Sequence, residues 1–305
     1  MLQSRRFAMR IQRAEKYGFC AGVRIADRKV KKFASLGGDD GKILGQVVHN
    51  ERVVDEMEAL GVSTIESLEE IDEGTVVFSA HGVPPSYHRQ ARSRGLKILD
   101  TTCPFVYDIH EEADRALAEG AHLVFIGEPE HREVIGYTKD REPGTFHILK
   151  TEEEAEKVDW SLYPKVKVLY QTTLNSEDYE DVVKLIESRS SNASRADTIC
   201  YATKENQDAA RVLCADPAVG LVLVIGGKKS ANTRHLWEIC RESKPSHLIQ
   251  GPQDLRSEWF EGVDVVGVTA GASTPDYVID EVEQAILEWP VATSSDRPEL
   301  ERGES

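Results

Sequence analysis

Three cysteines are the residues of this sequence best suited to bind a metal cofactor. Each lies in a short motif of its own, and these motifs are Gly18-Phe19-Cys20-Ala21-Gly22, Asp100-Thr101-Thr102-Cys103-Pro104 and Asp197-Thr198-Ile199-Cys200. The chain between successive cysteines is long enough for one small α/β unit, which suggests that three similar lobes each deliver one thiolate to a common centre. Three thiolates can hold three irons of a cubane cluster and leave the fourth iron open for a substrate.

The cysteines taken alone leave two other interpretations open. Three reduced thiols in turns would fit the same spacing, because glycine and proline beside Cys20 and Cys103 favour tight turns. A zinc site is the second interpretation, although zinc usually takes Cys-x-x-Cys pairs and the sequence has none. The two remaining cysteines, Cys214 and Cys240, lie in helical patterns and are expected to be buried core residues.

Three of the nine histidines lie in loops that follow predicted strands. They are His49 in Val-Val-His-Asn, His81 in Ser-Ala-His-Gly-Val and His131 in Glu-His-Arg-Glu-Val. Imidazole can donate to phosphate oxygens, act as an acid or bind a metal. Glu133 follows His131 by two residues, and it could relay protons if its surroundings raise its pKa. A surface or core role is expected for the other six histidines.

Two loops of small residues, 226–233 and 269–275, precede predicted helices and contain Ser230, Asn232 and Ser273. Helix N-termini of this kind bind anions through free backbone N–H groups, although ordinary N-capping would explain either loop alone. The first loop does not fit the P-loop pattern, which argues against a nucleotide triphosphatase.

Short strand patterns alternate with amphipathic helical patterns along the chain, which predicts mostly parallel sheets covered by helices. The polar residues described above follow the predicted strands, where ligands bind in such folds. The predicted strands are 42–48, 75–79, 97–99, 122–126, 167–171, 220–225, 246–249 and 264–269, and the predicted helices are 51–60, 85–94, 106–118, 176–188, 204–214 and 275–288.

The composition of the 305 residues argues against several classes of partner. With 37 basic and 53 acidic residues, the net charge of −16 does not suit a nucleic-acid-binding protein. No apolar run approaches the roughly 20 residues that cross a bilayer. The N-terminal segment 1–10 lacks the apolar region of a secretory signal, and the five cysteines do not resemble a disulfide framework. A cytoplasmic protein that acts on small molecules is therefore expected.

The ordered motifs of the chain resemble those of the 4-hydroxy-3-methylbut-2-enyl diphosphate reductase family, from about Tyr17 to Glu288. The resemblance rests on the three cysteine motifs together with His-Asn, Ser-Ala-His-Gly-Val, His-x-Glu-Val, Gln-Thr-Thr-Leu, Ser-x-Asn-Thr and Ala-Gly-Ala-Ser-Thr-Pro-Asp, in the order of the family. It implies a trefoil of three α/β lobes around a [4Fe–4S] cluster, in lobes spanning 9–102, 103–199 and 200–290, followed by a disordered tail at 291–305.

The resemblance also implies the roles of the site residues. Cys20, Cys103 and Cys200 would ligate the cluster, and Glu133 would donate protons together with Thr172 and His131. The diphosphate would be held by His49, His81, His131, Thr172, Ser230, Asn232 and Ser273. The implied reaction is the two-electron reductive dehydroxylation that yields isopentenyl and dimethylallyl diphosphate, in the last step of the non-mevalonate isoprenoid pathway. Electrons would come from a ferredoxin or flavodoxin, and oxygen could convert the cluster to a [3Fe–4S] form.

Five positions depart from the commonest family pattern, and they bear on substrate affinity. Ala231 stands in place of a second serine, Arg132 in place of a proline, and Asn206 in place of an arginine. Ile135 and Tyr137 also differ from the family form. None of the five is expected to contact a cluster ligand or Glu133. They leave open a related cluster-dependent reductase or dehydratase that acts on another allylic or hydroxylated compound. A cluster-bearing sensor or electron carrier is disfavoured, because carriers usually ligate all four irons with cysteine.

Overall fold

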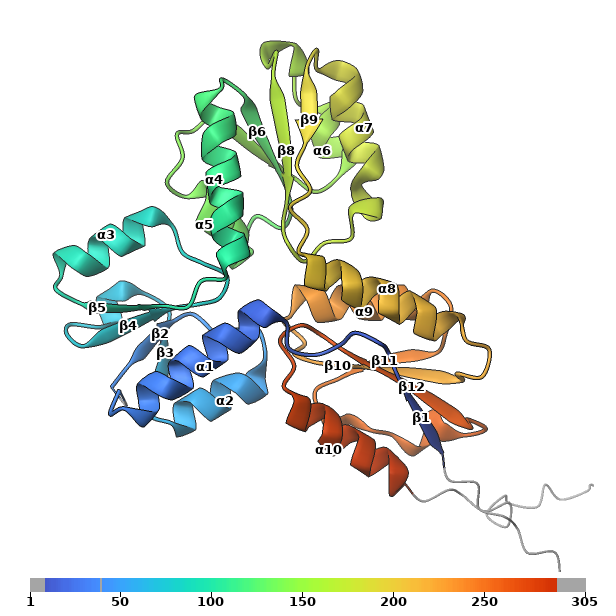
Figure 1. The fold of residues 1–305 in the computed structure, drawn as a ribbon. Helices are drawn as coiled ribbons and strands as arrows, with labels where there is room; N and C mark the ends of the chain where they lie inside the picture. The colour runs from blue at the N-terminus through green and yellow to red at the C-terminus, as the bar shows by residue number, and fades with distance from the viewer. Residues whose placement is uncertain (1–8, 39, 290–305) are drawn as a thin grey trace, which may run out of the picture.

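Three four-stranded sheets, each with all of its strands parallel, form the framework of the chain (Figure 1). The computed structural model describes residues 9–38 and 40–289, so the tail predicted at 291–305 lies outside the described residues. In spatial order, the first sheet contains β3 (Ser63–Ile65), β2 (Lys42–Leu44), β4 (Thr75–Phe78) and β5 (Lys97–Asp100). The second sheet contains β7 (Phe146–Leu149), β6 (His122–Ile126), β8 (Val166–Tyr170) and β9 (Ala193–Arg195). The third sheet contains β11 (Ser246–Ile249), β10 (Leu221–Ile225), β12 (Val265–Ala270) and β1 (Arg10–Arg13).

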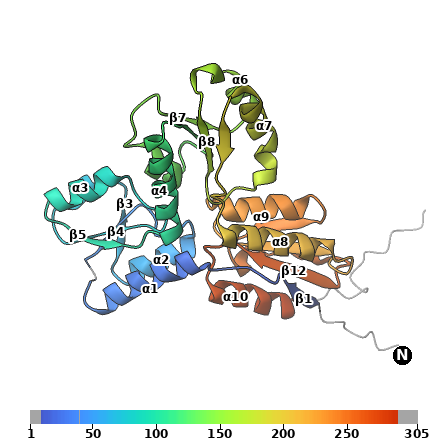
Figure 2. The same ribbon diagram turned by 45° about the horizontal axis from the view of Figure 1, so that its top comes forward.

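Helices cover both faces of every sheet, so that each lobe has one apolar core on either side of its sheet (Figures 1 and 2). This arrangement explains the sequence of the inner strands, because all residues of β4, β6, β10 and β12 are buried. The helices are α1 (Ala21–Ser35), α2 (Glu51–Ala59) and α3 (Pro85–Ser93) in the first lobe; α4 (Pro104–Ala118), α5 (Arg132–Thr138), α6 (Glu152–Glu156) and α7 (Glu180–Arg189) in the second; α8 (Tyr201–Ala215), α9 (Ala231–Arg241) and α10 (Asp276–Leu287) in the third. In the part of the chain that the structure describes, no helix has the length and apolar character needed to cross a bilayer.

The three sheets share one strand order, and the N-terminal strand completes the third of them. β5 and β9 occupy the outer position next to β4 and β8, and β1 occupies the same position next to β12. The strand Arg10–Arg13 therefore belongs to the third sheet, and its assignment to the first lobe with residues 9–102 is corrected on this point. The reason is its parallel pairing with β12, in which Arg10 lies opposite Val265 and Arg13 opposite Val268.

Each cysteine motif lies where the chain leaves one sheet and enters the helix layer of the next lobe. β1 leads through Cys20 into α1, β5 through Cys103 into α4, and β9 through Cys200 into α8. These three helices point their N-terminal ends at the centre of the trefoil (Figure 1). A threefold repeat of strand, cysteine and helix therefore brings together residues from distant parts of the sequence.

Candidate active site

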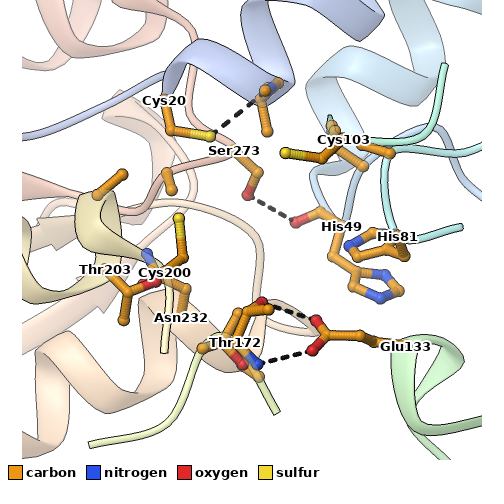
Figure 3. A pocket seen from close by; sticks show the side chains of 18 of the residues that line it. Cys20, His49, His81, Cys103, Glu133, Thr172, Cys200, Thr203, Asn232 and Ser273 are labelled. Carbon is orange, nitrogen blue, oxygen red and sulfur yellow. Dashed lines mark hydrogen bonds between the residues drawn. The ribbon is translucent and has the colours of Figure 1, made fainter. Parts of the chain in front are cut away.

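A cavity lies where the three lobes meet, and every site residue predicted from the sequence lines it (Figure 3). These residues are Cys20, His49, His81, Cys103, His131, Glu133, Thr172, Cys200, Ser230, Asn232 and Ser273. The first lobe contributes two of the histidines, the second contributes Glu133 and Thr172, and the third contributes Ser230, Asn232 and Ser273. The structure therefore assembles one site from all three lobes.

The cysteine trio (Cys20, Cys103 and Cys200) occupies the N-cap positions of α1, α4 and α8. The glycines and proline beside Cys20 and Cys103 also allowed an interpretation as reduced thiols in turns, whereas both cysteines directly precede helices, and Pro104 is the first residue of α4. Each cysteine donates its backbone N–H to a carbonyl two residues beyond an inner strand of the neighbouring sheet, namely Ala272, Ala80 and Thr172, at 3.0–3.1 Å. The equivalent bonds fix the three side chains in equivalent orientations.

The helix N-termini place hydrogen-bond donors around the three sulfurs. The Val23 amide lies 3.4 Å from Cys20 Sγ and donates to it. Burial raises the pKa of all three thiols, while backbone N–H groups in the first turn of each helix oppose this rise. Free N–H groups and the positive end of the helix dipole both favour thiolate over thiol. The N–H groups at the three helix ends therefore favour thiolates, and anionic groups bound to them, at this side of the cavity.

Gly22 lies in the first turn of α1 and leaves room for the second cysteine. A Cβ at this position would lie 2.6 Å from Cys103 Sγ and 3.9 Å from Cys20 Sγ. Any side chain at residue 22 would therefore displace Cys103. The requirement for glycine comes from this close approach.

The histidine trio (His49, His81 and His131) forms the opposite side of the cavity. The ring centroids of His49 and His81 lie 4.4 Å apart, and His131 lies 5.7 Å from His49 and 5.9 Å from His81. Burial lowers the pKa of each imidazole, and that of His131 falls to about 4. Positive charge on Arg132 lowers the pKa values of His49 and His81 further. All three rings are therefore neutral near pH 7 when no anion is present.

Two of these rings have their tautomers fixed by neighbouring groups. His131 Nδ1 accepts a hydrogen bond from the Glu133 amide at 3.3 Å, so the proton of the neutral ring lies on Nε2. His49 Nδ1 lies 3.2 Å from Gln46 Oε1, an acceptor, so the proton of its neutral ring lies on Nδ1. His131 can thus donate to an anion while neutral, whereas His49 must gain a proton to donate through Nε2.

Several buried polar atoms around the cavity have no hydrogen-bond partner within the described protein. They are His81 Nδ1 and both amide atoms of Asn232. Buried polar groups are normally paired, so these atoms represent hydrogen-bonding capacity kept for a ligand. Ser230 caps α9, and Asn232 lies in its first turn, where backbone N–H groups also favour an anion.

Among the residues that the structure describes, Glu133 is the one acidic residue that lines the cavity, and it is 1% exposed. Its Oε1 accepts hydrogen bonds from the Thr172 amide at 2.7 Å and the Tyr137 hydroxyl at 3.1 Å. Its Oε2 lies 2.7 Å from Thr172 Oγ1. Burial raises the pKa of Glu133 to about 7, against the lowering effect of these three donors. Since Oε1 already accepts two donors, the proton of the neutral acid belongs on Oε2, facing the Thr172 hydroxyl.

The departures from the family pattern lie in different parts of the site. Tyr137 contacts Glu133 directly, which corrects the expectation that none of the five would do so. The residues are four positions apart on α5 and therefore share a helix face, a spacing that the sequence contained. Ala231 lines the cavity, and Asn206 is buried in α8 with Nδ2 unpaired. Thr203 also lines the cavity, and sequence reasoning had not singled it out.

The fold and the site together define an enzyme of three α/β lobes with its active site at their junction. All three lobes supply site residues, and the site combines three thiols, neutral anion-binding groups and one acid with a pKa near 7.

Comparison with known proteins identifies the family. Residues 11–287 match the LytB protein family, and the chain belongs to that family. A reductase of 4-hydroxy-3-methylbut-2-enyl diphosphate from Acidithiobacillus ferrooxidans is 36% identical over 297 residues, which cover 96% of this chain and 93% of the relative. A protein of the same name from Tolumonas auensis is 38% identical over 280 residues, covering 90% of each chain.

Two solved structures share the fold. A structure of (E)-4-hydroxy-3-methyl-but-2-enyl diphosphate reductase, the terminal enzyme of the non-mevalonate pathway, has a TM-score of 0.68 at 35% identity and covers 92% of this chain and 100% of its own. The structure of the E-1-hydroxy-2-methyl-but-2-enyl-4-diphosphate reductase from Plasmodium falciparum has a TM-score of 0.84 at 27% identity, with coverages of 90% and 86%.

Proposed function

We propose that this chain converts 4-hydroxy-3-methylbut-2-enyl diphosphate to isopentenyl and dimethylallyl diphosphate. The reaction takes up two electrons and two protons, breaks the bond between carbon and the hydroxyl oxygen, forms one carbon–hydrogen bond and releases water. The observation that carries the proposal is that one cavity, where the three lobes meet, is lined by the cysteine trio, the histidine trio and Glu133 (Figure 3). The family and the named relatives support the same activity.

The cysteine trio fits a [4Fe–4S] cluster better than a single ion. Within residues 9–38 and 40–289, no three His, Cys, Asp or Glu side chains converge closely enough to ligate one metal ion. One zinc ion would require its sulfurs about 2.3 Å from a common centre. The missing Cβ of Gly22 and the N–H groups at three helix ends suit a larger anionic group. When bound, such a cluster supplies electrons one at a time and an open iron position for the hydroxyl end of the substrate.

The residues opposite the cysteines suit the diphosphate. Neutral hydrogen-bond donors are available from His81, His131, Asn232 and the hydroxyls of Ser230 and Ser273. Because these groups carry no charge, they do not repel one another electrostatically when the site is empty. The N-terminus of α9 adds backbone N–H groups and its dipole. This arrangement would direct the diphosphate to the seam between the first and third lobes and leave the hydroxyl end toward the cysteines.

Glu133 and Thr172 would deliver the protons. At pH 7 about half of the Glu133 population is protonated, given its pKa of about 7. A hydroxyl both donates and accepts, so Thr172 can pass a proton from Glu133 Oε2 into the cavity over the 2.7 Å contact.

The deciding experiment is an anaerobic assay of the purified protein with 4-hydroxy-3-methylbut-2-enyl diphosphate and a reduced dye. We expect both isopentenyl and dimethylallyl diphosphate among the products, and no turnover of the dephosphorylated alcohol. Turnover of another allylic substrate instead would establish a divergent reductase. Reversible reduction without turnover of any such compound would establish an electron carrier or sensor.

Serine substitutions test the cofactor assignment separately. Serine is a good N-cap, so Cys20→Ser, Cys103→Ser or Cys200→Ser keeps its helix start while removing a ligand. Each variant should retain its far-ultraviolet circular dichroism but lose the brown colour and most of its iron. Cys214→Ser is the matched control, because Cys214 is buried in the core of the third lobe and should leave iron content unchanged. Full iron content in all three variants would contradict the assignment.

The proposed electron donor is a small acidic redox protein such as a ferredoxin or flavodoxin. The residue after each cysteine, Ala21, Pro104 and Tyr201, is exposed, which places the sulfur side of the cavity close to the surface. Tyr201 is 57% exposed. A negative charge in Tyr201→Glu should slow turnover with the protein donor but not with the small dye. Val212→Glu, at an exposed position farther along α8, should slow neither.

A further inference from the structure

Arg132 extends from the second lobe across the seam to the first. It is the first residue of α5, and its side chain is 33% exposed. The guanidinium lies against Gly45, which follows β2, so closely that a Cβ at Gly45 would overlap guanidinium atoms. Gly45 has φ of +74°, a conformation that also favours glycine. The backbone of the first lobe at Gly45 thus leaves a flat surface against which the guanidinium packs.

An ion pair holds the guanidinium in that position. Arg132 Nη2 lies 2.6 Å from Glu66 Oε2, which follows β3 at the outer edge of the first sheet. The Glu66 side chain is 74% exposed, so water and salt screen its charge. The carboxylate therefore orients Arg132 without cancelling its charge on the cavity side.

Arg132 lies close to two rings of the histidine trio. Its chain neighbours His131 and Glu133 both line the cavity, and its guanidinium lies against Gly45, next to Gln46, whose side chain is 3.2 Å from His49 Nδ1. The charge of Arg132 lowers the pKa values of His49 and His81, which means that the electrostatic potential at these rings disfavours an added positive charge. Lys229 acts on His49 in the same direction, and Glu51 opposes them. His131 faces Arg234 and His235, with Glu128 opposing. A potential that disfavours imidazolium favours an anion at the same place.

We propose that Arg132 is a specificity-determining residue, a fixed cation held at the seam by Gly45 and Glu66 that strengthens binding of the diphosphate beside the histidine trio. The inference deepens the proposed function and depends on it only for the identity of the organic part of the substrate. Because the groups that line the cavity are mostly neutral, the positive charges around it, Arg132 together with Lys229 and Arg234, supply the electrostatic attraction.

Calorimetry with inorganic pyrophosphate tests this role on the cluster-loaded protein without turnover. Arg132→Gln should weaken binding about tenfold at low ionic strength, with a smaller difference at high salt, as expected for loss of one charge. Arg132→Lys should restore most of the affinity. Arg52→Gln is the matched control, because it also removes an ion pair between lobes, with Glu281 at 2.7 Å, but Arg52 is absent from the charges that act on the histidines. Its affinity should equal that of the wild type.

The variant Glu66→Gln separates the effect of the charge of Arg132 from the effect of its ion pair between the first two lobes. It removes the bridge but keeps the cation, so pyrophosphate affinity should be equal to or above that of the wild type. A loss in Glu66→Gln as large as in Arg132→Gln, or unchanged affinity in Arg132→Gln, would overturn the proposal. With the substrate, Arg132→Gln should raise KM about tenfold and change kcat less than about twofold. If the wild type turns over no such substrate, the proposed function fails, while the pyrophosphate measurements still decide the role of Arg132.

Discussion

Glu133 shows how opposing effects set the acidity of one residue. Full burial disfavours its charged form, while the three donors from Thr172 and Tyr137 favour it. Burial prevails, so the acid keeps a proton at pH values where most carboxyls have lost theirs. The donors also hold the carboxyl in one orientation, which makes it suitable for proton transfer in a fixed direction.

Replacing this carboxyl should slow catalysis without preventing binding. Glu133→Gln keeps the shape and the acceptor at Oε1 but cannot transfer a proton, so kcat should fall about 10²- to 10⁴-fold. Iron content and pyrophosphate affinity should stay unchanged. Glu130→Gln, in the exposed loop before α5, serves as the control in the same assay. A kcat within about threefold of the wild type in Glu133→Gln would assign the proton donor elsewhere.

The pH dependence of kcat should report the same group. Because the acid must be protonated, kcat should fall as pH rises through about 7. In Tyr137→Phe, one donor that lowers the pKa is lost, so the pKa rises further and the fall in kcat moves to higher pH, by up to about one unit. The measurement is kcat against pH between 5.5 and 9 for both proteins. A shift to lower pH would contradict the assignment of Tyr137 as a donor to the carboxylate.

Anion binding should be coupled to proton uptake by His49. Its pKa lies below the ordinary value in the free protein, and a bound diphosphate would raise it. Affinity should therefore be greatest below the pKa of His49 in the free protein and should fall as pH rises from that value through the higher pKa of the complex. Calorimetry of pyrophosphate binding in buffers of different ionisation enthalpy should reveal proton uptake near pH 7, reduced in His49→Gln. No proton uptake would mean that His49 stays neutral and accepts, or does not contact, the anion.

At the scale of single residues, the sequence was sufficient to name most of the polar groups that line the cavity, with Thr203 as an exception, but not all of their contacts. The motifs identified the cysteines, the histidines and Glu133 because each has a recognisable sequence context. The contact of Tyr137 with Glu133 and the reach of Arg132 to Gly45 depend on how α5 packs, which single-residue motifs do not encode.

At the level of secondary structure, the prediction succeeded for inner strands and failed for most outer ones. The strands without a sequence prediction, β1, β3, β7 and β9, all lie at sheet edges and span three or four residues. Edge strands are partly exposed and lack a continuous apolar run, so they resemble loops in sequence. The predicted starts of α4 and α8 were two and three residues late, and α1, α5 and α6 had no predicted helix.

Gly22 lowers the intrinsic stability of the first turn of α1 but leaves the space that the cysteine side chains of the site need. Alanine is a better helix former than glycine by up to about 1 kcal/mol. Gly22→Ala should therefore favour the helix, yet its methyl group would displace Cys103 Sγ. We expect iron content to fall severely after anaerobic reconstitution, while the protein without cofactor keeps or gains thermal stability. Gly120→Ala is not a suitable control because of its positive φ, whereas at Gly136, in α5, the new Cβ would lie 4.0 Å from His110 Nε2, an ordinary contact distance. Equal iron content in Gly22→Ala and Gly136→Ala would contradict this explanation.

For the molecule as a whole, polar contacts join the lobes at all three seams. Arg132 pairs with Glu66 between the first and second lobes, Arg234 with Glu128 between the second and third, and Arg52 with Glu281 between the third and first. The apolar cores remain separate within the lobes. The relative positions of the three lobes around the site thus depend on polar contacts whose strength water and salt can reduce.

We expect the N-terminal strand β1 to be as important for binding of the proposed cofactor as β9, which has the equivalent position in the second lobe. The Ala14 amide, just after β1, donates to the Val268 carbonyl at 2.8 Å, and the Ala196 amide, just after β9, donates to Val168 at 2.9 Å. Proline at either position removes the donor and should destabilise the protein by about 1–3 kcal/mol. Ala14→Pro should lower the melting temperature and the iron content to a similar degree as Ala196→Pro. Full iron content in Ala14→Pro alone would show that β1 is dispensable for positioning Cys20.

The pairing of β1 with β12 also has a consequence for biosynthesis. The ribosome releases β1 before the other two cysteine motifs, whereas its partner strand β12 and the Ala272 carbonyl that binds the Cys20 amide come after Cys200 in the sequence. Cys20 therefore reaches its final position only after β12 has been synthesised. A chain interrupted before β12 would contain all three cysteines but would not hold Cys20 in place for the proposed cluster.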